Sequence, residues 1–249
     1  MSPWELLAAF AGSFVAGYLG SAVGLVLGTL RLPLMVLLAG SPTAAAGTNI
    51  AISSASAASG SIRHAREGRV DWRIVAWMAP PSIAGAILGA LYGELVPERA
   101  LSALIGALLV WNGIDLLFRP VRARPSSRPK RLPAAGLGFV IGLVGGAVGV
   151  ILGTLRMPAL LGAVGLSAQR AVGTNLVVGF LLGLFAFGTY AAQLEVEWSL
   201  LAAGLAGALP GGWMGARLTG KASEETLRRA IGAALLLVGG AFALQAFVS

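Results

Sequence analysis

The sequence predicts an all-α polytopic membrane protein built from two inverted-topology repeats, each with about five apolar segments and a short broken or re-entrant helix. Three observations predict this fold class. Hydrophobic residues make up 57% of the 249 residues and charged residues only 11%, against about 25% charged residues in soluble domains. Motifs of the first half return in the second half, and equivalent loops carry opposite charge. The composition therefore predicts about 8–10 membrane segments.

The apolar segments are long, and few charged side chains interrupt them. Between residues 1 and 60, for example, the only charged side chains are those of Glu5 and Arg31. Apolar runs of this length are typical of membrane-spanning helices. The segments are expected at 4–28, 32–40, 43–62, 73–93 and 99–118 in the first half, and at 134–152, 157–166, 169–188, 198–217 and 226–247 in the second.

The second segment of each half is too short to cross a hydrocarbon core of about 30 Å as a regular helix. Each starts just before a proline, Pro33 or Pro158, which suits a helix N-terminus because the missing N–H is not needed there. Gly28 and Gly153 precede these prolines and are expected to permit a non-helical turn. The sequence therefore predicts a half-helix or re-entrant arm in each repeat.

An internal duplication relates the two halves of the chain. Several motifs recur in the same order, first at an offset of 125 residues and then of 126. Such ordered recurrence indicates a repeat architecture. The clearest pairs are Gly28–Pro33 with Gly153–Pro158, Gly47–Asn49 with Gly173–Asn175, and Val70–Trp72 with Val196–Trp198.

A basic linker separates the repeats. Residues 119–131 carry six positive charges, three prolines and no acidic residue, a composition typical of an exposed linker. The excess of Lys and Arg predicts that this linker is cytoplasmic. Residues 1–118 then form the first membrane repeat and residues 132–249 the second.

Loop charges predict opposite orientations for the two repeats. The loop at 63–69 is basic and is expected in the cytoplasm, whereas its equivalent at 189–197 contains Glu195 and Glu197 with no basic residue and is expected outside. Equivalent loops on opposite sides are the pattern of an inverted repeat. This arrangement places both termini outside the membrane, which the chain crosses several times.

Two arginines are the leading candidates for a substrate site. Arg31 and Arg156 occupy equivalent positions within apolar sequence, where a charged side chain is costly and marks a function or a structural partner. A guanidinium fork suits oxyanions and carboxylates, and the adjacent Thr29 and Thr154 could donate hydroxyl hydrogen bonds. The backbone at Gly28 and Gly153 would complete the site. The alternative is that the arginines reach an interface or bond carbonyl groups of an irregular turn.

A second pair of polar residues is also duplicated. Thr48 and Asn49 correspond to Thr174 and Asn175 and could offer hydroxyl and amide groups to the same ligand. Alternatively, these side chains join packed helices by hydrogen bonds.

Asp115 is a candidate for ion coupling because it lies in an apolar stretch. It could carry a proton, or it could balance the positive charge of a site arginine when no substrate is bound. Alternatively, it forms a salt bridge at the cytoplasmic end. No cofactor or metal site is expected, since the chain has no cysteine, one histidine and no Walker motif. Enzymatic activity and nucleic-acid binding are not expected either. The expected partners are a small anionic substrate and the lipid bilayer, and homo-oligomerisation stays open.

The order of these motifs resembles the sulfite exporter TauE/SafE family of prokaryotic membrane transporters. The resemblance covers almost the whole chain and includes the break before Pro33, the Ala46–Asn49 segment, the basic loop ending at Asp71–Trp72, and their duplicates. It implies an inner-membrane carrier of sulfur-containing or carboxylate anions. Family members often have an apolar residue where Arg31 stands, so the two arginines distinguish this chain.

The leading hypothesis is a secondary transporter that moves a small anion, such as a sulfur oxyanion, organosulfonate or related organic acid, by alternating access around a midplane site between the repeats. A passive anion channel and a membrane accessory subunit without transport of its own are the alternatives. The substrate, the coupling ion and the direction of transport stay open.

Overall fold

The computed structural model describes residues 1–23, 28–93, 95–118 and 129–216, together with three residue pairs between 232 and 240. All regular elements within these residues are helical, which confirms the predicted all-α class. Nine of the ten predicted segments correspond to described helices, whereas most of segment 226–247 and residues 119–128 of the linker lie outside the described part. The helices are α1 (Pro3–Val23), α2 (Gly28–Ala39), α3 (Pro42–Arg66), α4 (Trp72–Gly93), α5 (Glu98–Phe118), α6 (Arg131–Val148), α7 (Gly153–Pro158), the π-helix η1 (Ala159–Val164), α8 (Ala168–Ala192) and α9 (Trp198–Ala216).

Three of the described helices are long and apolar enough to cross a membrane: Trp72–Gly93, Arg131–Val148 and Gln169–Ala192. Helix α3 is also long, with 25 residues, but it carries many buried small and polar residues instead of an apolar surface. This composition suits a helix that is surrounded by other helices, where small residues allow close packing.

The helix α3 has well-defined signals at both ends. Ser41 adopts an extended conformation and its hydroxyl accepts the N–H of Ala44 at 3.1 Å, while Pro42 occupies the first turn. Both features favour a helix start. Three basic residues in the last turn complement the helix dipole, and Gly68, with φ +67°, then reverses the chain.

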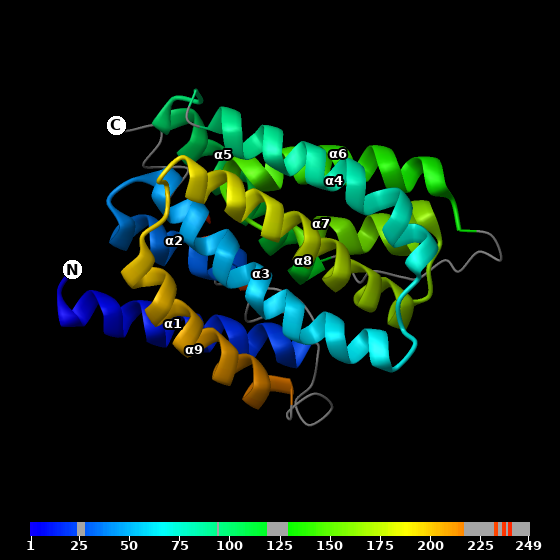
Figure 1. Ribbon diagram of the computed structural model, residues 1–249, viewed down its shortest axis with the longest axis horizontal. Helices are drawn as coiled ribbons and strands as arrows, with labels where there is room; N and C mark the ends of the chain where they lie inside the picture. Colours follow the sequence, from blue (N-terminus) through cyan, green and yellow to red (C-terminus); the bar gives the residue numbers. More distant parts are fainter. Residues whose placement is uncertain are drawn as a thin grey trace.

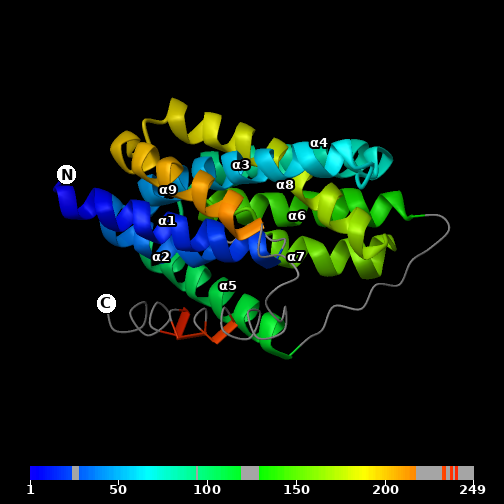
Figure 2. The same cartoon turned by 90° about the horizontal axis from the view of Figure 1, so that it is seen from below.

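The long helices lie side by side along the longest axis of the molecule (Figure 1). Helices α3 and α8 pack together in the middle, α4 packs on α6, and α1 packs on α9. The view from below shows α5 on the side away from α3 and α4 (Figure 2). Each outer pair therefore joins one helix from each half of the chain.

Glycines allow these outer pairs to approach closely. A Cβ atom on Gly85 of α4 would collide with the carbonyl oxygen of Phe139 on α6, and a Cβ atom on Gly211 of α9 would collide with that of Phe14 on α1. These two contacts are equivalent under the sequence duplication. Small residues at such crossings are the usual means of helix packing in lipid.

We expect Gly142→Ala to destabilise the protein because a Cβ atom at this position of α6 would overlap the backbone carbonyl of Ser82 on α4. The expected loss is about 1–3 kcal/mol. Gly136→Ala in the same helix is the control, since nothing lies within 4 Å of its Cβ position; it should be neutral or gain about 0.5–1 kcal/mol. Thermal unfolding in detergent measures both, and equal unfolding temperatures would contradict the predicted packing.

Candidate functional site

Arg31 is buried in the first turn of α2 and hydrogen-bonded to α3. Its side chain is 3% exposed. Nε donates to Asn49 Oδ1 at 3.0 Å, and Nη2 donates to the Asn49 carbonyl oxygen at 3.0 Å and to Ser53 Oγ at 2.7 Å. Asn49 and Ser53 are one helical turn apart, so both face α2. These bonds tie the short helix to the central helix of its own repeat.

Arg156 is completely buried at the equivalent position in α7, but it has fewer partners. Nη1 donates to Asn175 Oδ1 at 3.1 Å. Nε and Nη2 have no hydrogen-bond partner within the described residues. In the sequence alignment of the repeats, Gly179 takes the place of Ser53, so α8 has no hydroxyl where α3 has one.

Neither arginine pairs with a carboxylate in the described part of the chain. The ion pairs found there join Arg63 and Arg69 to Glu67, and Arg170 to Asp71. Two buried guanidinium groups without a counter-charge are unusual, because a buried charge is normally paired.

The predicted turns at Gly28 and Gly153 were wrong in position. Both glycines are the first residues of helices, and neither has a positive φ. The short helices therefore begin four residues before the predicted positions 32 and 157. In the second repeat the turn lies at Gly149, which ends α6 with φ +71°. Pro158 lies at the end of α7, where its missing N–H cannot continue the α-helical pattern, and a π-helical turn follows.

The two glycines instead allow α2 and α7 to lie close to the central helices. A Cβ atom on Gly28 would overlap Ser53 Oγ, and one on Gly153 would lie 3.0 Å from Asn175 Nδ2. Their small size brings the following arginines within hydrogen-bonding distance of α3 and α8.

Asn49 also connects the two repeats. Its Nδ2 donates to the carbonyl oxygen of Gly149 at 2.8 Å, which lies in the break between α6 and α7. Asn49 therefore accepts from one arginine and fixes the backbone that leads to the other. The structure thus brings together the predicted residues Arg31, Asn49 and Gly28 as one group, and Arg156, Asn175 and Gly153 as another.

The predicted threonines occupy two different settings. Thr48 Oγ1 accepts the backbone N–H of Glu197 at 2.9 Å, and Thr174 Oγ1 accepts that of Asp71 at 3.0 Å. Each hydroxyl thus holds a loop of the other half of the chain. Thr29 and Thr154 lie two residues before the arginines in the chain and are both buried. Thr29 Oγ1 has no hydrogen-bond partner among the described residues.

Asp115 is partly exposed in the C-terminal part of α5. Its proposed role in coupling stays a prediction. Within the described residues, no group of three or more His, Cys, Asp or Glu side chains could hold a metal ion.

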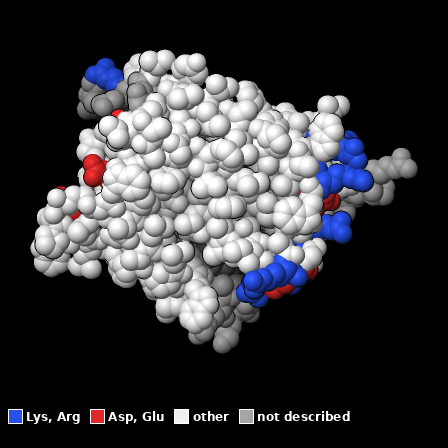
Figure 3. Space-filling view, viewed as in Figure 1, with Lys and Arg blue, Asp and Glu red and all other residues white. Residues whose placement is uncertain are grey.

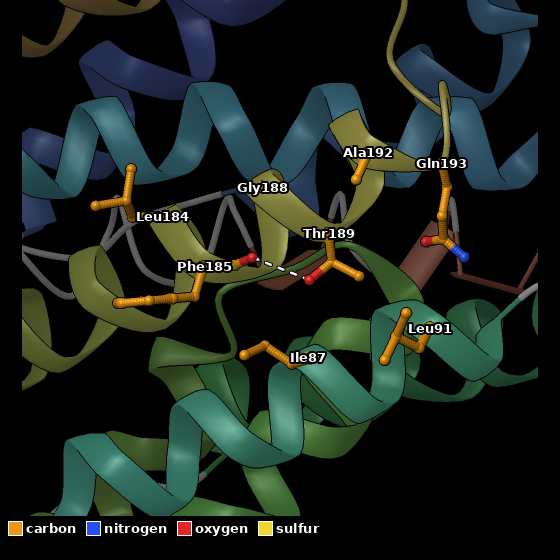
Figure 4. Close-up of a pocket in the computed structure, with 8 residues that line it drawn as sticks. All are labelled: Ile87, Leu91, Leu184, Phe185, Gly188, Thr189, Ala192 and Gln193. Carbon is orange, nitrogen blue, oxygen red and sulfur yellow. Dashed lines mark hydrogen bonds between the residues drawn. The ribbon is translucent and has the colours of Figure 1, made fainter.

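An open groove of about 580 Å³ lies between α4 and α8 (Figure 4). Two polar side chains line it: Thr189, whose Oγ1 donates to the Phe185 carbonyl oxygen at 3.1 Å, and Gln193, whose Oε1 has no hydrogen-bond partner among the described residues. This apolar surface suits hydrocarbon chains and offers no cation to an anion. It is lined by Ile87, Leu91, Leu184, Phe185, Gly188, Thr189, Ala192 and Gln193.

Ser53 and Gly179 are the neighbours of the two arginines that the sequence did not single out. The only available signal was their difference: the repeats match at Asn49 and Asn175 but differ one turn later. Neither residue type is distinctive alone, and only the structure shows that Ser53 contacts Arg31.

Comparisons with known proteins find related membrane proteins. The model of the family described as sulfite exporter TauE/SafE matches residues 9–242. A probable membrane transporter protein of Xylella fastidiosa (strain 9a5c) is 29% identical over 235 residues, covering 89% of this chain and 90% of the relative. The probable membrane transporter protein YjnA of Bacillus subtilis (strain 168) is 28% identical over 244 residues, covering 92% and 95%. No solved structure matches the chain.

The family match extends from α1 beyond the last long helix that the structure describes, so it concerns the whole bundle and not a single motif. The relatives are likewise matched over nearly their full lengths. The resemblance predicted from the duplicated motifs is thereby confirmed: this multi-pass membrane protein belongs to the sulfite exporter TauE/SafE family of membrane transporters.

Proposed function

We propose that the protein is a secondary transporter of small anions with its substrate site at the two short helices, α2 and α7. The observation that carries this proposal is the burial of Arg31 and Arg156 without a carboxylate partner in the described residues. Both charges lie within a membrane bundle, where an ionised group is costly unless it serves a ligand or a pathway. A transported anion would neutralise this charge.

The chemistry of the two arginines favours oxyanions as substrates. A guanidinium group offers several N–H donors in one plane, which match the oxygens of a carboxylate, sulfonate or sulfite group. The family description names sulfite, and the substrate class proposed for this chain is sulfur oxyanions, organosulfonates or related organic acids. The direction of transport, import or export, is measured by the flux assay.

Equivalent contacts between the halves support alternating access by two inverted repeats, 1–118 and 132–249. The bonds from Glu197 to Thr48 and from Asp71 to Thr174 are related by the 126-residue offset. The pairs α1 with α9 and α6 with α4 are related in the same way. Transporters of this type move one structural repeat against another around a central site.

The positions of the loops support the inverted arrangement and the membrane orientation. The turn between α3 and α4 lies at the right-hand end of the molecule and the loop between α8 and α9 at the left-hand end (Figure 1). Most basic side chains in view gather at the right-hand end, and uncharged surface fills the region between the ends (Figure 3). By the positive-inside rule, the right-hand end faces the cytoplasm of a prokaryotic inner membrane.

A ligand screen followed by a flux assay tests the proposed function. Thermal unfolding of the detergent-purified protein is measured with sulfite, sulfate, thiosulfate, methanesulfonate, acetate and chloride. We expect at least one oxyanion to raise the unfolding temperature, because a ligand that binds the folded state stabilises it. The same anion should enter proteoliposomes and should accelerate its own exchange when present on both sides.

The outcomes separate transport from the alternatives. Single-channel currents without accelerated exchange would indicate a passive anion channel. Absence of both anion stabilisation and flux for the whole panel, together with stable co-purification of another membrane protein, would indicate an accessory subunit. Either result would overturn the proposed carrier function.

A further inference from the structure

We propose that the two arginines have different tasks: Arg31 fastens α2 to α3, whereas Arg156 alone contacts the anion through its Nε–Nη2 edge. This inference rests on the proposed function and specifies which residue binds. It also names the two positions that distinguish the arginines: Ser53, which bonds Arg31, and Gly179, which offers no hydroxyl to Arg156.

The two guanidinium groups differ in which of their N–H donors are hydrogen-bonded. Nε–H and one Nη2–H point in the same direction and form the edge that binds two oxygens at once. In Arg31 this edge is occupied by Asn49 Oδ1, the Asn49 carbonyl oxygen and Ser53 Oγ. In Arg156 the side chain is held by Nη1 on Asn175 instead, and both Nε and Nη2 lack a partner within the described residues.

The difference between the repeats is concentrated one helical turn after the asparagines. Ser53 Oγ is 2.7 Å from Arg31 Nη2. Gly179 has no side chain, and a Cβ atom built on it would lie 2.9 Å from Ile151 Cγ2 and 3.6 Å from Arg156 Nη1, the nitrogen that already donates to Asn175. A serine hydroxyl at this position would therefore lie nearest to Nη1 and would compete with Asn175 for the nitrogen that orients the Arg156 guanidinium.

The geometry of the free edge defines the ligand class. Two parallel N–H donors match two oxygens bound to one carbon or sulfur atom, as in carboxylates, sulfonates and sulfite. A halide has a single centre and cannot use both donors in this directed manner. Arg31 contributes positive charge to the region without a direct contact.

The test compares Gly179→Ser with Gly179→Ala, because both add the same Cβ atom and only serine adds a hydroxyl. Affinity for methanesulfonate, sulfite and acetate is measured from anion-dependent thermal stabilisation and from flux into proteoliposomes. We expect Gly179→Ser to weaken oxyanion binding about tenfold, because its hydroxyl competes with Asn175 for Nη1 and turns the Nε–Nη2 edge away from its position. Gly179→Ala shares the contact of the Cβ atom with Ile151 but has no hydroxyl, so it should bind oxyanions more tightly than Gly179→Ser. Chloride should stabilise the wild type far less than the oxyanions.

Ser53→Ala tests the other half of the proposal. It removes one bond of Arg31 and keeps its charge, so we expect a lower unfolding temperature of the free protein with oxyanion affinity within about twofold of the wild type. Equal weakening in Gly179→Ala and Gly179→Ser, or chloride binding as strong as that of methanesulfonate, would overturn the assignment of Arg156. Loss of oxyanion affinity in Ser53→Ala would overturn the structural role assigned to Arg31. A wild type that binds no anion would instead overturn the proposed function.

Discussion

Asn49→Leu is expected to lower the free energy of unfolding by about 3–5 kcal/mol, because it leaves buried polar groups without partners. The substitution removes the Oδ1 atom that accepts Arg31 Nε and the Nδ2 atom that donates to Gly149. Arg31 keeps its bonds to the backbone carbonyl of residue 49 and to Ser53, so the guanidinium group is only partly satisfied. Leucine has nearly the shape of asparagine, which limits the change to hydrogen bonding.

The double variant Arg31→Met, Asn49→Leu separates the charge from the helix contact. Replacing both members of a buried polar pair by apolar residues is often neutral or stabilising, whereas removing one member is not. We therefore expect the double variant to regain about 2 kcal/mol relative to Asn49→Leu, with the Gly149 carbonyl still unpaired. Denaturant or thermal unfolding in detergent provides the measurement, and gel filtration confirms a folded state. A double variant less stable than Asn49→Leu would show that Arg31 is not held as the hydrogen bonds indicate.

The helices were predictable because their apolar runs and turn residues are local features. Apolar stretches with few charged residues located nine of the described helical segments, and Pro33 and Pro158 marked the two short ones. The starts of the short helices were missed by four residues. From the sequence, Gly28 and Gly153 were predicted to permit turns. In the fold, their small size instead allows close contact with α3 and α8, and such contacts depend on residues far away in the chain.

The candidate site was predictable in composition but not in detail. The duplication correctly identified Arg31 and Arg156 as equivalent, and it suggested equal roles for them. Equivalence of residue types cannot show which donor atoms are occupied, because this depends on the rotation of each guanidinium group against its helix. The unequal partners became visible only when Ser53 was found next to Arg31 and Gly179 next to Arg156.

Arg156→Met is expected to abolish anion transport while leaving the ligand-free protein at least as stable as the wild type. The side chain is fully buried, with one hydrogen bond to Asn175 and two donors without partners in the described residues. Such a group is costly to bury, and the flexible methionine fills similar space without charge. We expect an unchanged or higher unfolding temperature without anion, and no further increase when an oxyanion is added.

The expected loss of transport follows from the strength of the missing contact. Two charge-assisted hydrogen bonds of about 1.5–3 kcal/mol each correspond to a decrease in affinity of at least 100-fold. Arg156→Lys should fall between the wild type and Arg156→Met, because lysine keeps the charge and loses the planar fork. Flux into proteoliposomes and anion-dependent unfolding temperatures measure both effects.

Arg63→Met is the control for removing a positive charge. Arg63 is exposed and pairs with Glu67 at 3.1 Å, and exposed ion pairs contribute little to stability. This variant should transport as the wild type does. A stable ligand-free Arg156→Met protein with lost transport would mean that the wild type accepts an uncompensated buried charge for the sake of its substrate. A destabilised Arg156→Met protein that still transports oxyanions would instead assign Arg156 to the structure of the bundle.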